Sequence, residues 1–348
     1  MDNFEKSMLF SEFKDLLIRE MFELTTSDGN PVVNQMAEKF RNLEALQWNT
    51  KVLGSELASF HYKNSNNQIR PAKFDMFSLS WAACRYDDFV QKWFIDTCSQ
   101  LRISPILHRK IWEEIYIINV LKNRGMLKPG MRGIVFGVGL ERLPAYFGSL
   151  GVEILATDLA PNNSSSQSWI NTNQHGSLSN LYFQELISKS MFDNQISFEF
   201  ADMNNIPNEW NGLFDFCWST CALEHLGSIS NGSNFIFNTG KLLKKGGVSV
   251  HTTEFNYTNN EETIDNWPTV LFRKKDIDNI ANKLLASGYE IPDINYDVGN
   301  TPVDRFIDIP PFPHHDSYYD SSMNSLHLKL LVDGFPCTCF GINFVKKN

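Results

Sequence analysis

The stretch RGIVFGVGLER, residues 132–142, contains an apolar run, two glycines separated by one residue, and the start of a helical pattern. The run 132–137 has the length and apolar content of a buried strand, and the helical pattern continues to about residue 150. Gly137 and Gly139 allow a ligand to approach the backbone closely, and a helix N-terminus attracts negatively charged groups. This strand, turn and helix therefore predict a site for a nucleoside-containing cofactor.

A second apolar run, VEILAT at 152–157, follows this helix and leads directly into Asp158. An acid at the end of the second strand of such a unit accepts hydrogen bonds from ribose hydroxyls. The dinucleotide fingerprint has a third glycine at the position of Arg142, and this bulky side chain argues against NAD or FAD. An NAD-dependent oxidoreductase is therefore the less favoured interpretation of the turn.

Strands and helices continue to alternate along the rest of the chain. Buried strands are predicted at 196–201, 214–218 and 247–252, and the helices between and after them at about 177–189, 232–243 and 275–286. Near the end, Asp333-Gly334 separates two further apolar runs and is a strong hairpin signal. The pattern predicts an α/β protein with a Rossmann-like, mostly parallel seven-stranded sheet and an antiparallel C-terminal strand.

The first 126 residues lack strand-like alternation and are predicted to form an N-terminal helical domain. Helices are expected at about 33–53, 77–101 and 105–121. We therefore place a domain boundary at 126/127 and expect residues 1–126 to form a cap that selects the substrate. Candidate residues of this region for the acceptor side of the site are Trp81, Arg85, His108, Arg109 and Trp112.

Five segments in order resemble the successive motifs of class I S-adenosylmethionine (SAM)-dependent methyltransferases. These segments are VFGVGLER, ATDLAP, FADMNNIP, FDFCWSTCALEHLGS and LLKKGGVSVHTTEF. The resemblance covers residues 131–255 well and implies a SAM-dependent methyltransferase domain at 127–348. The whole-chain pattern is also similar to bacterial methyltransferases that are associated with polysaccharide biosynthesis.

This resemblance implies roles for residues at the matching positions. The glycine turn, Gly137, Val138 and Gly139, would lie beside the methionyl part of the cofactor, and Asp158 with Leu159 would lie at its ribose. The residues implied for adenine and for the methionyl side are Asp202, Met203 and Ser219. Alternative roles remain open: a helix cap for Asp158, a turn for Asp202 and core packing for Met203. Val135 replaces an acid that the family usually has, so Glu141 or Arg142 is expected to replace some contacts.

Polar residues follow the fourth and fifth predicted strands, where the carboxyl ends of parallel strands form ligand sites. The candidate catalytic residues are Glu224 and His225 after one strand, and His251 and Glu254 in and after the next. A general base assists methyl transfer to a hydroxyl, and the same four side chains can converge on a divalent metal ion. Alternatively, His225 is a capping residue, His251 is a core histidine, and Cys221 is an inert thiol.

Composition narrows the classes of partner. The net charge of −9 argues against binding to nucleic acid through its phosphates. The six cysteines show no metal-binding spacing and are expected to be free thiols, and neither a membrane span nor a signal peptide is predicted, so a cytoplasmic protein is expected. The favoured function is O-methylation of a sugar or saccharide precursor. The alternatives are N-methylation of a small metabolite and an inactive methyltransferase-like scaffold.

Overall fold

The computed structural model describes residues 28, 33–64, 80–163, 166, 170–171, 174–310, 312 and 326–347. The chain divides into two compact units, Met1–Glu56 and Leu57–Asn348. Helix α2 (Val33–Asn64) begins in the first unit and ends in the second. Residues 57–126, which the sequence assigns to the N-terminal region, therefore belong to the same unit as the sheet.

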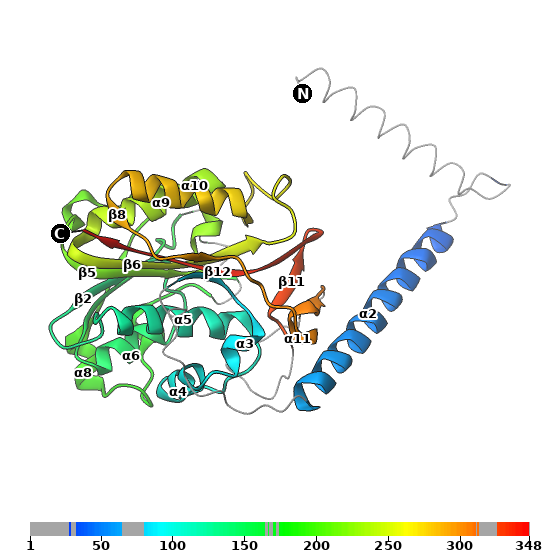
Figure 1. Cartoon of the computed structure of the whole chain (residues 1–348), viewed down its shortest axis with the longest axis horizontal. Helices are drawn as coiled ribbons and strands as arrows, with labels where there is room; N and C mark the ends of the chain where they lie inside the picture. The colour runs from blue at the N-terminus through cyan, green and yellow to red at the C-terminus, as the bar shows by residue number, and fades with distance from the viewer. Residues whose placement is uncertain are drawn as a thin grey trace, which may run out of the picture. The chain divides into compact units, whose positions relative to one another are not determined.

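The larger unit is built on a mixed sheet whose main path has the order β10-β11-β12-β6-β5-β2-β3-β4 (Figure 1). Its parallel strands are β2 (Arg132–Val135), β3 (Glu153–Asp158), β4 (Ile196–Phe200), β5 (Phe214–Thr220) and β6 (Leu243–Asn256). From β2 the chain proceeds outward through β3 and β4, and then returns to the other side of β2 to form β5 and β6. The strand order thus reverses between β2 and β5, and in open α/β sheets ligands bind at this switch point, outside the carboxyl ends of the strands.

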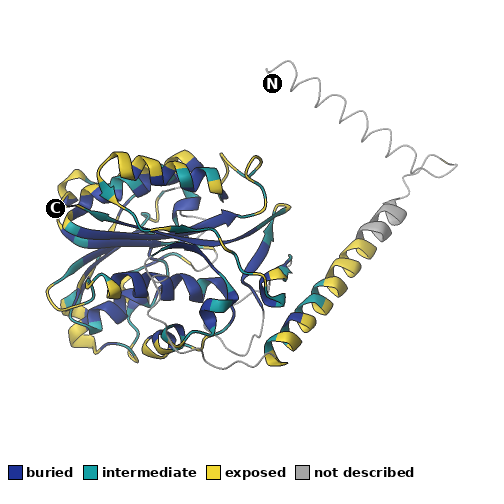
Figure 2. Cartoon of the chain, in the orientation of Figure 1, coloured by how far each residue is buried: buried dark blue, intermediate teal, exposed yellow. Residues whose placement is uncertain are grey.

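Helices cover both faces of this sheet (Figure 1). One face carries α5 (Arg109–Asn123), α6 (Leu143–Ser149) and α8 (Lys189–Gln195), and the other carries α9 (Ile229–Leu242) and α10 (Lys274–Ala286). Alternate strand residues enter two separate hydrophobic clusters: Val135 and Trp218 pack on the α5 side, whereas Ile134 and Cys217 pack on the α9 side. Because both faces are buried, the strands appear in the sequence as continuous apolar runs (Figure 2).

The C-terminal hairpin follows the sequence prediction. Strand β12 (Phe335–Lys346) runs antiparallel to both β11 (Lys329–Val332) and β6. Asp333 and Gly334 connect β11 to β12 with φ angles of 47° and 84°. Positive φ at both residues is the geometry of the two-residue turn that Asp-Gly favours. The predicted antiparallel C-terminal strand is therefore confirmed.

The sheet has 12 strands rather than the predicted seven. The additional strands are short: β1 (Trp81–Ala83), β7 (Phe272–Arg273), β8 (Tyr289–Glu290), β9 (Ile294–Asn295) and β10 (Ile307–Asp308). Strands of two or three residues do not show a period in the sequence, which is why periodicity did not predict them. They form because neighbouring strands supply hydrogen bonds; β1, for example, pairs with both β12 and β9.

Two predicted helices are wrong in part. The expected helix at 77–101 is instead β1 followed by α3 (Tyr86–Phe89) and α4 (Lys92–Gln100) among its described residues. The expected helix at 177–189 is a 3-10 turn, Leu178–Leu181, and α8 begins only at Lys189, where Ser188 Oγ accepts a hydrogen bond from Met191 N. An N-cap at that point starts a new helix instead of continuing an earlier one.

The remaining short elements connect these layers. They are the 3-10 turns η4 (Asn208–Trp210) and η5 (Leu223–His225) and the helix α11 (Pro302–Arg305). Within the described part of the chain, no helix combines the length and the apolar character needed to cross a membrane.

Candidate functional site

The glycine turn after β2 is supported by Asp158 at the end of β3. Gly137 and Gly139 have φ angles of 61° and 50°, which other L-residues adopt at a cost. Asp158 Oδ2 accepts hydrogen bonds from Gly139 N at 3.1 Å and from Gly176 N at 2.8 Å, and its Oδ1 accepts one from Leu159 N at 2.8 Å. Asp158 therefore links the turn, its own strand end and the segment at Gly176.

The same turn is in close contact with two other segments. A Cβ atom added to Gly137 would lie 2.8 Å from Ala222 Cβ, in the loop between β5 and η5. A Cβ atom added to Gly139 would lie 3.1 Å from the carbonyl oxygen of Gln174. The absence of a side chain at Gly137 thus lets the turn lie against the loop that leads to Glu224, and the absence of one at Gly139 lets it lie against Gln174.

The predicted adenine pair lies beside a cavity after β4. Met203 lines a cavity of about 350 Å³, and the other lining residues are Asn204, Asn231, Asn234, Phe235 and Asn238. Asp202 Oδ1 accepts a hydrogen bond from Asn204 N at 2.8 Å and holds the turn in place. Amide side chains offer both donors and acceptors, and this volume is within the range of small-molecule sites. The residues at the switch point therefore have the chemical character that a nucleoside-containing cofactor requires.

A larger cavity of about 630 Å³ lies elsewhere on the same unit. Its lining residues are Ser99, Gln100, Arg102, Lys122, Leu127, Tyr146, Ser149, Leu150, Glu185 and Leu186. None of the predicted cofactor or catalytic residues is among them.

Ser219 and His251 face the α9 side of the sheet and are fully buried. His251 Nδ1 is 2.8 Å from Ser219 Oγ, and its Nε2 is 2.7 Å from Ser249 Oγ and 3.2 Å from Thr239 Oγ1. Burial lowers the pKa of His251 to about 3, so the ring is neutral. His251 and Glu254 are three residues apart on a strand and project from opposite faces, so the structure does not bring these two predicted site residues together.

A buried group of charged residues lies on the α5 side, at the carboxyl ends of β5 and β6. Arg109 Nη1 is 2.6 Å from Glu254 Oε1 and 3.3 Å from Glu113 Oε1. Glu113 Oε2 accepts a hydrogen bond from Thr252 Oγ1 at 2.7 Å, and Lys110 Nζ is 3.5 Å from Glu113 Oε1. Burial lowers the pKa of Arg109, but the neighbouring carboxylates outweigh this effect and raise it above its ordinary value. The first turn of α5 thus supplies the cations that balance the acids of this group.

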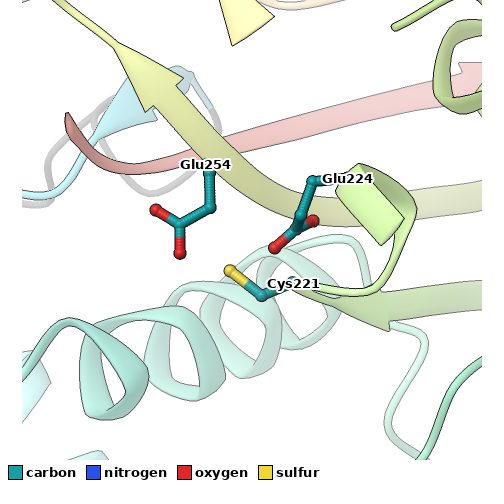
Figure 3. A group of neighbouring side chains, drawn as sticks. All are labelled: Cys221, Glu224 and Glu254. Atoms are coloured by element: carbon teal, nitrogen blue, oxygen red, sulfur yellow. The ribbon is translucent and has the colours of Figure 1, made fainter. Parts of the chain in front are cut away.

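Glu224 in η5 lies beside this group, and its carboxyl faces Cys221 and Glu254 (Figure 3). Its Oε2 accepts a hydrogen bond from Thr253 Oγ1 at 3.3 Å, whereas its Oε1 accepts none from the residues that the structure describes. The residue is 1% exposed, and burial raises the pKa of its carboxyl to about 7, with Lys110 partly offsetting the effect. Glu224 is therefore a buried acid that exchanges its proton near neutral pH.

His225 adjoins Glu224 but makes its principal contacts outside the charged group. Its Nδ1 is 3.1 Å from the carbonyl oxygen of Pro268 and 3.1 Å from Thr269 Oγ1. Because a carbonyl oxygen only accepts, Nδ1 carries the hydrogen and Nε2 carries the lone pair. Nε2 lies 3.9 Å from Glu224 Oε1, and burial lowers the pKa of His225 to about 4. The ring is thus neutral and held in place by a backbone carbonyl.

The predicted metal site is not assembled as expected. Atoms of Cys221, Glu224 and Glu254 that can bind a metal lie within 4.8 Å of one another, but His251 is on the other face of the sheet. Glu254 Oε1 is already paired with Arg109, and burial raises the pKa of the Cys221 thiol well above its ordinary value. Only Glu224 retains an uncommitted anionic oxygen, and the adjacent guanidinium repels a cation. These residues therefore do not fit a divalent metal ion.

Several residues of the site were missed or only loosely indicated by the sequence. Glu113 lies four residues after Arg109 on α5, a spacing that signals an ion pair on a helix. His327 Nδ1 is 2.7 Å from Asp308 Oδ2, and the His327 ring stacks on that of His108 with centroids 4.7 Å apart. Asp308 is in β10, whereas His327 precedes β11. No local motif therefore links the two residues.

Glu141, which the sequence offers as a substitute for a missing acid, is 5% exposed. Its Oε2 accepts a hydrogen bond from Trp218 Nε1 at 3.0 Å, and burial raises its pKa to about 8. Arg142 instead pairs with Glu185 at 2.7 Å, and its guanidinium lies 4.7 Å from the centre of the Phe183 ring. Glu141 is therefore mostly protonated and uncharged at neutral pH.

Comparison of the sequence with protein-family models and with curated proteins finds no match. Comparison with solved structures finds similar chains. A putative sarcosine dimethylglycine methyltransferase from Galdieria sulphuraria is 13% identical, with a TM-score of 0.37 and coverage of 67% of this chain and 84% of that one. A putative methyltransferase from Bacillus halodurans is 14% identical, with a TM-score of 0.38 and coverage of 66% and 97%. The [4+2]-cyclase SpnF is 14% identical, with a TM-score of 0.41 and coverage of 68% and 82%. Likeness at this level does not assign a reaction.

Proposed function

We propose that this chain is a SAM-dependent methyltransferase that acts on a hydroxyl group of a small polar acceptor, a sugar or saccharide precursor. The observation that carries the proposal is the contact between Gly137 and Ala222. It joins the glycine turn, which Asp158 supports, to the loop that positions Glu224. The proposed nucleoside site and a buried acid of raised pKa would thereby be adjacent at the switch point of the sheet.

In this proposal the cofactor lies at the carboxyl ends of β2, β3 and β4. Asp158 accepts hydrogen bonds from the ribose hydroxyls, and the cavity at Met203 receives the base. SAM, when bound, supplies a methyl group that its sulfonium charge makes electrophilic. The protein contributes by holding the acceptor in line and by excluding water, which lowers the barrier through orientation.

Glu224 is the general base of the proposed reaction. Glu224 Oε1 would take the proton as the acceptor's O–H bond breaks, and SAM, when bound, would supply the methyl group to that oxygen and keep the electron pair of its carbon–sulfur bond on sulfur. A base with a pKa near the working pH is the most effective in proton transfer. The loss of the carboxylate charge accompanies the loss of the sulfonium charge, so the buried site does not accumulate net charge.

Arg109 and Glu254 are positioning residues in this mechanism. Their ion pair at 2.6 Å gives Glu254 a cationic partner, so its carboxylate charge is balanced although it lies beside Glu224. The net charge of −9 supports an uncharged or cationic small acceptor over nucleic acid, because phosphate contacts require a basic surface. A neutral sugar hydroxyl also needs the base that Glu224 provides, unlike an already nucleophilic thiolate.

The test has two parts. Calorimetric titration of the full chain with SAM and, separately, with NAD should show binding of SAM only. Transfer of a labelled methyl group to a panel of monosaccharides and nucleotide sugars should then require Glu224, so that Glu224→Gln binds SAM normally but transfers at least ~100-fold more slowly. Glu199→Gln, an exposed acid in β4, is the control and should behave as wild type. Absence of SAM binding, or full activity of Glu224→Gln, would refute the assignment.

A further inference from the structure

Most residues of helix α2 that Figure 2 colours are exposed, and several of them are large and apolar. Its large hydrophobic residues with the greatest exposure are Leu43 at 61%, Leu46 at 63%, Leu53 at 71%, Leu57 at 59% and Phe60 at 62%. Most of the large exposed hydrophobic residues in the described part of the chain are on this one helix. Soluble monomers rarely expose a contiguous apolar surface of this kind, which instead marks an interaction site.

The spacing of these residues specifies what kind of partner fits. We define the α2 seam as Leu43, Leu46, Thr50, Leu53, Leu57 and Phe60, whose steps alternate strictly between three and four residues. Alternating steps of three and four are the a and d positions of a heptad, which pack as knobs into the holes of another helix. A helix lying on a globular core would show a wider stripe with a period of 3.6 residues. Trp48 and Val52, 49% and 48% exposed, lie outside this spacing, whereas the α2 seam itself has the spacing that fits a single helix of similar length.

Thr50 does not interrupt the seam. Its hydroxyl donates a hydrogen bond to the carbonyl oxygen of Leu46 at 2.8 Å, within the same helix. With the hydroxyl satisfied in this way, the methyl group is the part available for packing against a partner.

We propose that the α2 seam pairs with the α2 seam of a second copy of this chain. The same seam on both partners is self-complementary, as a two-fold symmetric interface requires. Covering it buries on the order of 600 Å² on each copy, so the total of about 1,200 Å² reaches the lower end of specific, stable interfaces. Among the heptad positions that flank the seam, one carries an acid, Glu56, and two carry basic residues, His61 and Lys63. Flanking residues of the two helices therefore do not place like charges opposite one another.

The experiment uses the full chain and two matched double variants. Leu46→Glu with Leu53→Glu places two charges at d positions of the seam, seven residues apart. Ala45→Glu with Val52→Glu places the same two charges, also seven apart, at exposed positions beside the seam. Mass is measured by light scattering during size-exclusion chromatography at several concentrations, and helical content by circular dichroism.

Wild type and the Ala45/Val52 control should have twice the chain mass of 39.9 kDa. The Leu46/Leu53 variant should have the mass of one chain, with unchanged helical content, because replacing four buried leucines per dimer raises the dissociation constant by at least ~1,000-fold. A monomeric wild type would overturn the proposal, since the seam would then be covered within its own chain or not at all. A Leu46/Leu53 variant that remains dimeric would place the interface elsewhere and also overturn it.

Discussion

Replacing Arg109 with alanine tests the buried charged group directly. Arg109 Nη1 is 2.6 Å from Glu254 Oε1 and 3.3 Å from Glu113 Oε1, and the side chains of these two acids are 7% and 0% exposed. The Arg109→Ala variant leaves Glu254 in the protein interior without its cation, and it leaves Glu113 with only Lys110, whose Nζ is 3.5 Å from Glu113 Oε1. Breaking a buried pair in this way costs about 3 to 5 kcal/mol, because the remaining charge has lost both its water and its partner.

A surface ion pair of the same length provides the control. Lys92 Nζ is 2.6 Å from Asp96 Oδ2, but the two side chains are 58% and 50% exposed. Water replaces the lost partner at such a site, so Lys92→Ala should reduce the free energy of unfolding by less than ~1 kcal/mol. Both free energies are measured by urea unfolding at pH 7, followed by tryptophan fluorescence, and Arg109→Ala should move the midpoint by about 1 M or more.

The pH dependence of this loss identifies its cause. Without the guanidinium, the pKa of Glu254, already raised by burial, rises further in the folded variant. The folded variant then binds more protons than the unfolded chain, so its stability increases as the pH falls from 7 toward 5. Adding Glu254→Gln to Arg109→Ala should recover part of the loss at pH 7. Equal effects of Arg109→Ala and Lys92→Ala, or a loss independent of pH, would show that the charges are not buried together.

Three further predictions concern single acids. The pKa of Glu224 near 7 predicts that kcat/KM for methyl transfer rises with pH through about 7 and levels off above it, and Glu224→Gln should abolish the rise in a pH–rate profile. Glu141 has a pKa of about 8 in the folded protein, so the folded state binds more protons than the unfolded chain between pH 5 and 8. As the pH rises through this range, the free energy of unfolding of wild type should fall relative to that of Glu141→Gln, by up to ~1.4 kcal/mol per pH unit. Parallel curves of stability against pH for the two proteins would contradict this. Asp158→Asn retains one acceptor oxygen but loses the charge that holds the N–H groups of Gly139 and Gly176. Thermal unfolding should therefore show that the free energy of unfolding falls by about 1 to 3 kcal/mol. Calorimetry should show that the variant binds SAM at least ~10-fold more weakly. Unchanged SAM affinity would remove Asp158 from the cofactor site while leaving its structural role intact.

Much of the sheet could be predicted because its strands are buried on both faces. Apolar runs at β2, β3 and β4 stand out in the sequence, and each prediction falls within about two residues of the observed strand. Strand β6 is longer than predicted, because it begins at Leu243 and pairs with β12 as far as Asn256. Strand β1 was not predicted, because three residues carry no period and the strand exists only where β12 and β9 offer hydrogen bonds.

The candidate site, like the sheet, could be predicted from the sequence only in part. Glu224 and Glu254 could be placed near one another, since Glu224 follows β5 and Glu254 lies near the end of β6, both at the carboxyl edge of a parallel sheet. His251 does not converge with these acids, because residues three apart on a strand face opposite sides of the sheet, and its ring lies among Ser219, Ser249 and Thr239. Glu113 reaches Thr252 across 139 positions of sequence, a contact that no local pattern signals.

The sequence by itself determined where the main parallel strands lie along the chain, the glycine turn after β2 and the acids near the strand ends, because these depend on local apolar runs and on backbone freedom at two glycines. Only the tertiary structure decided which acids are charged. Arg109 arrives from α5 to pair with Glu254, while Glu224 is buried with one oxygen uncommitted, and the same kind of side chain thus acquires two different roles. The physical reason is that a pKa depends on desolvation and on neighbouring charges, and both are set by residues that are distant in the chain.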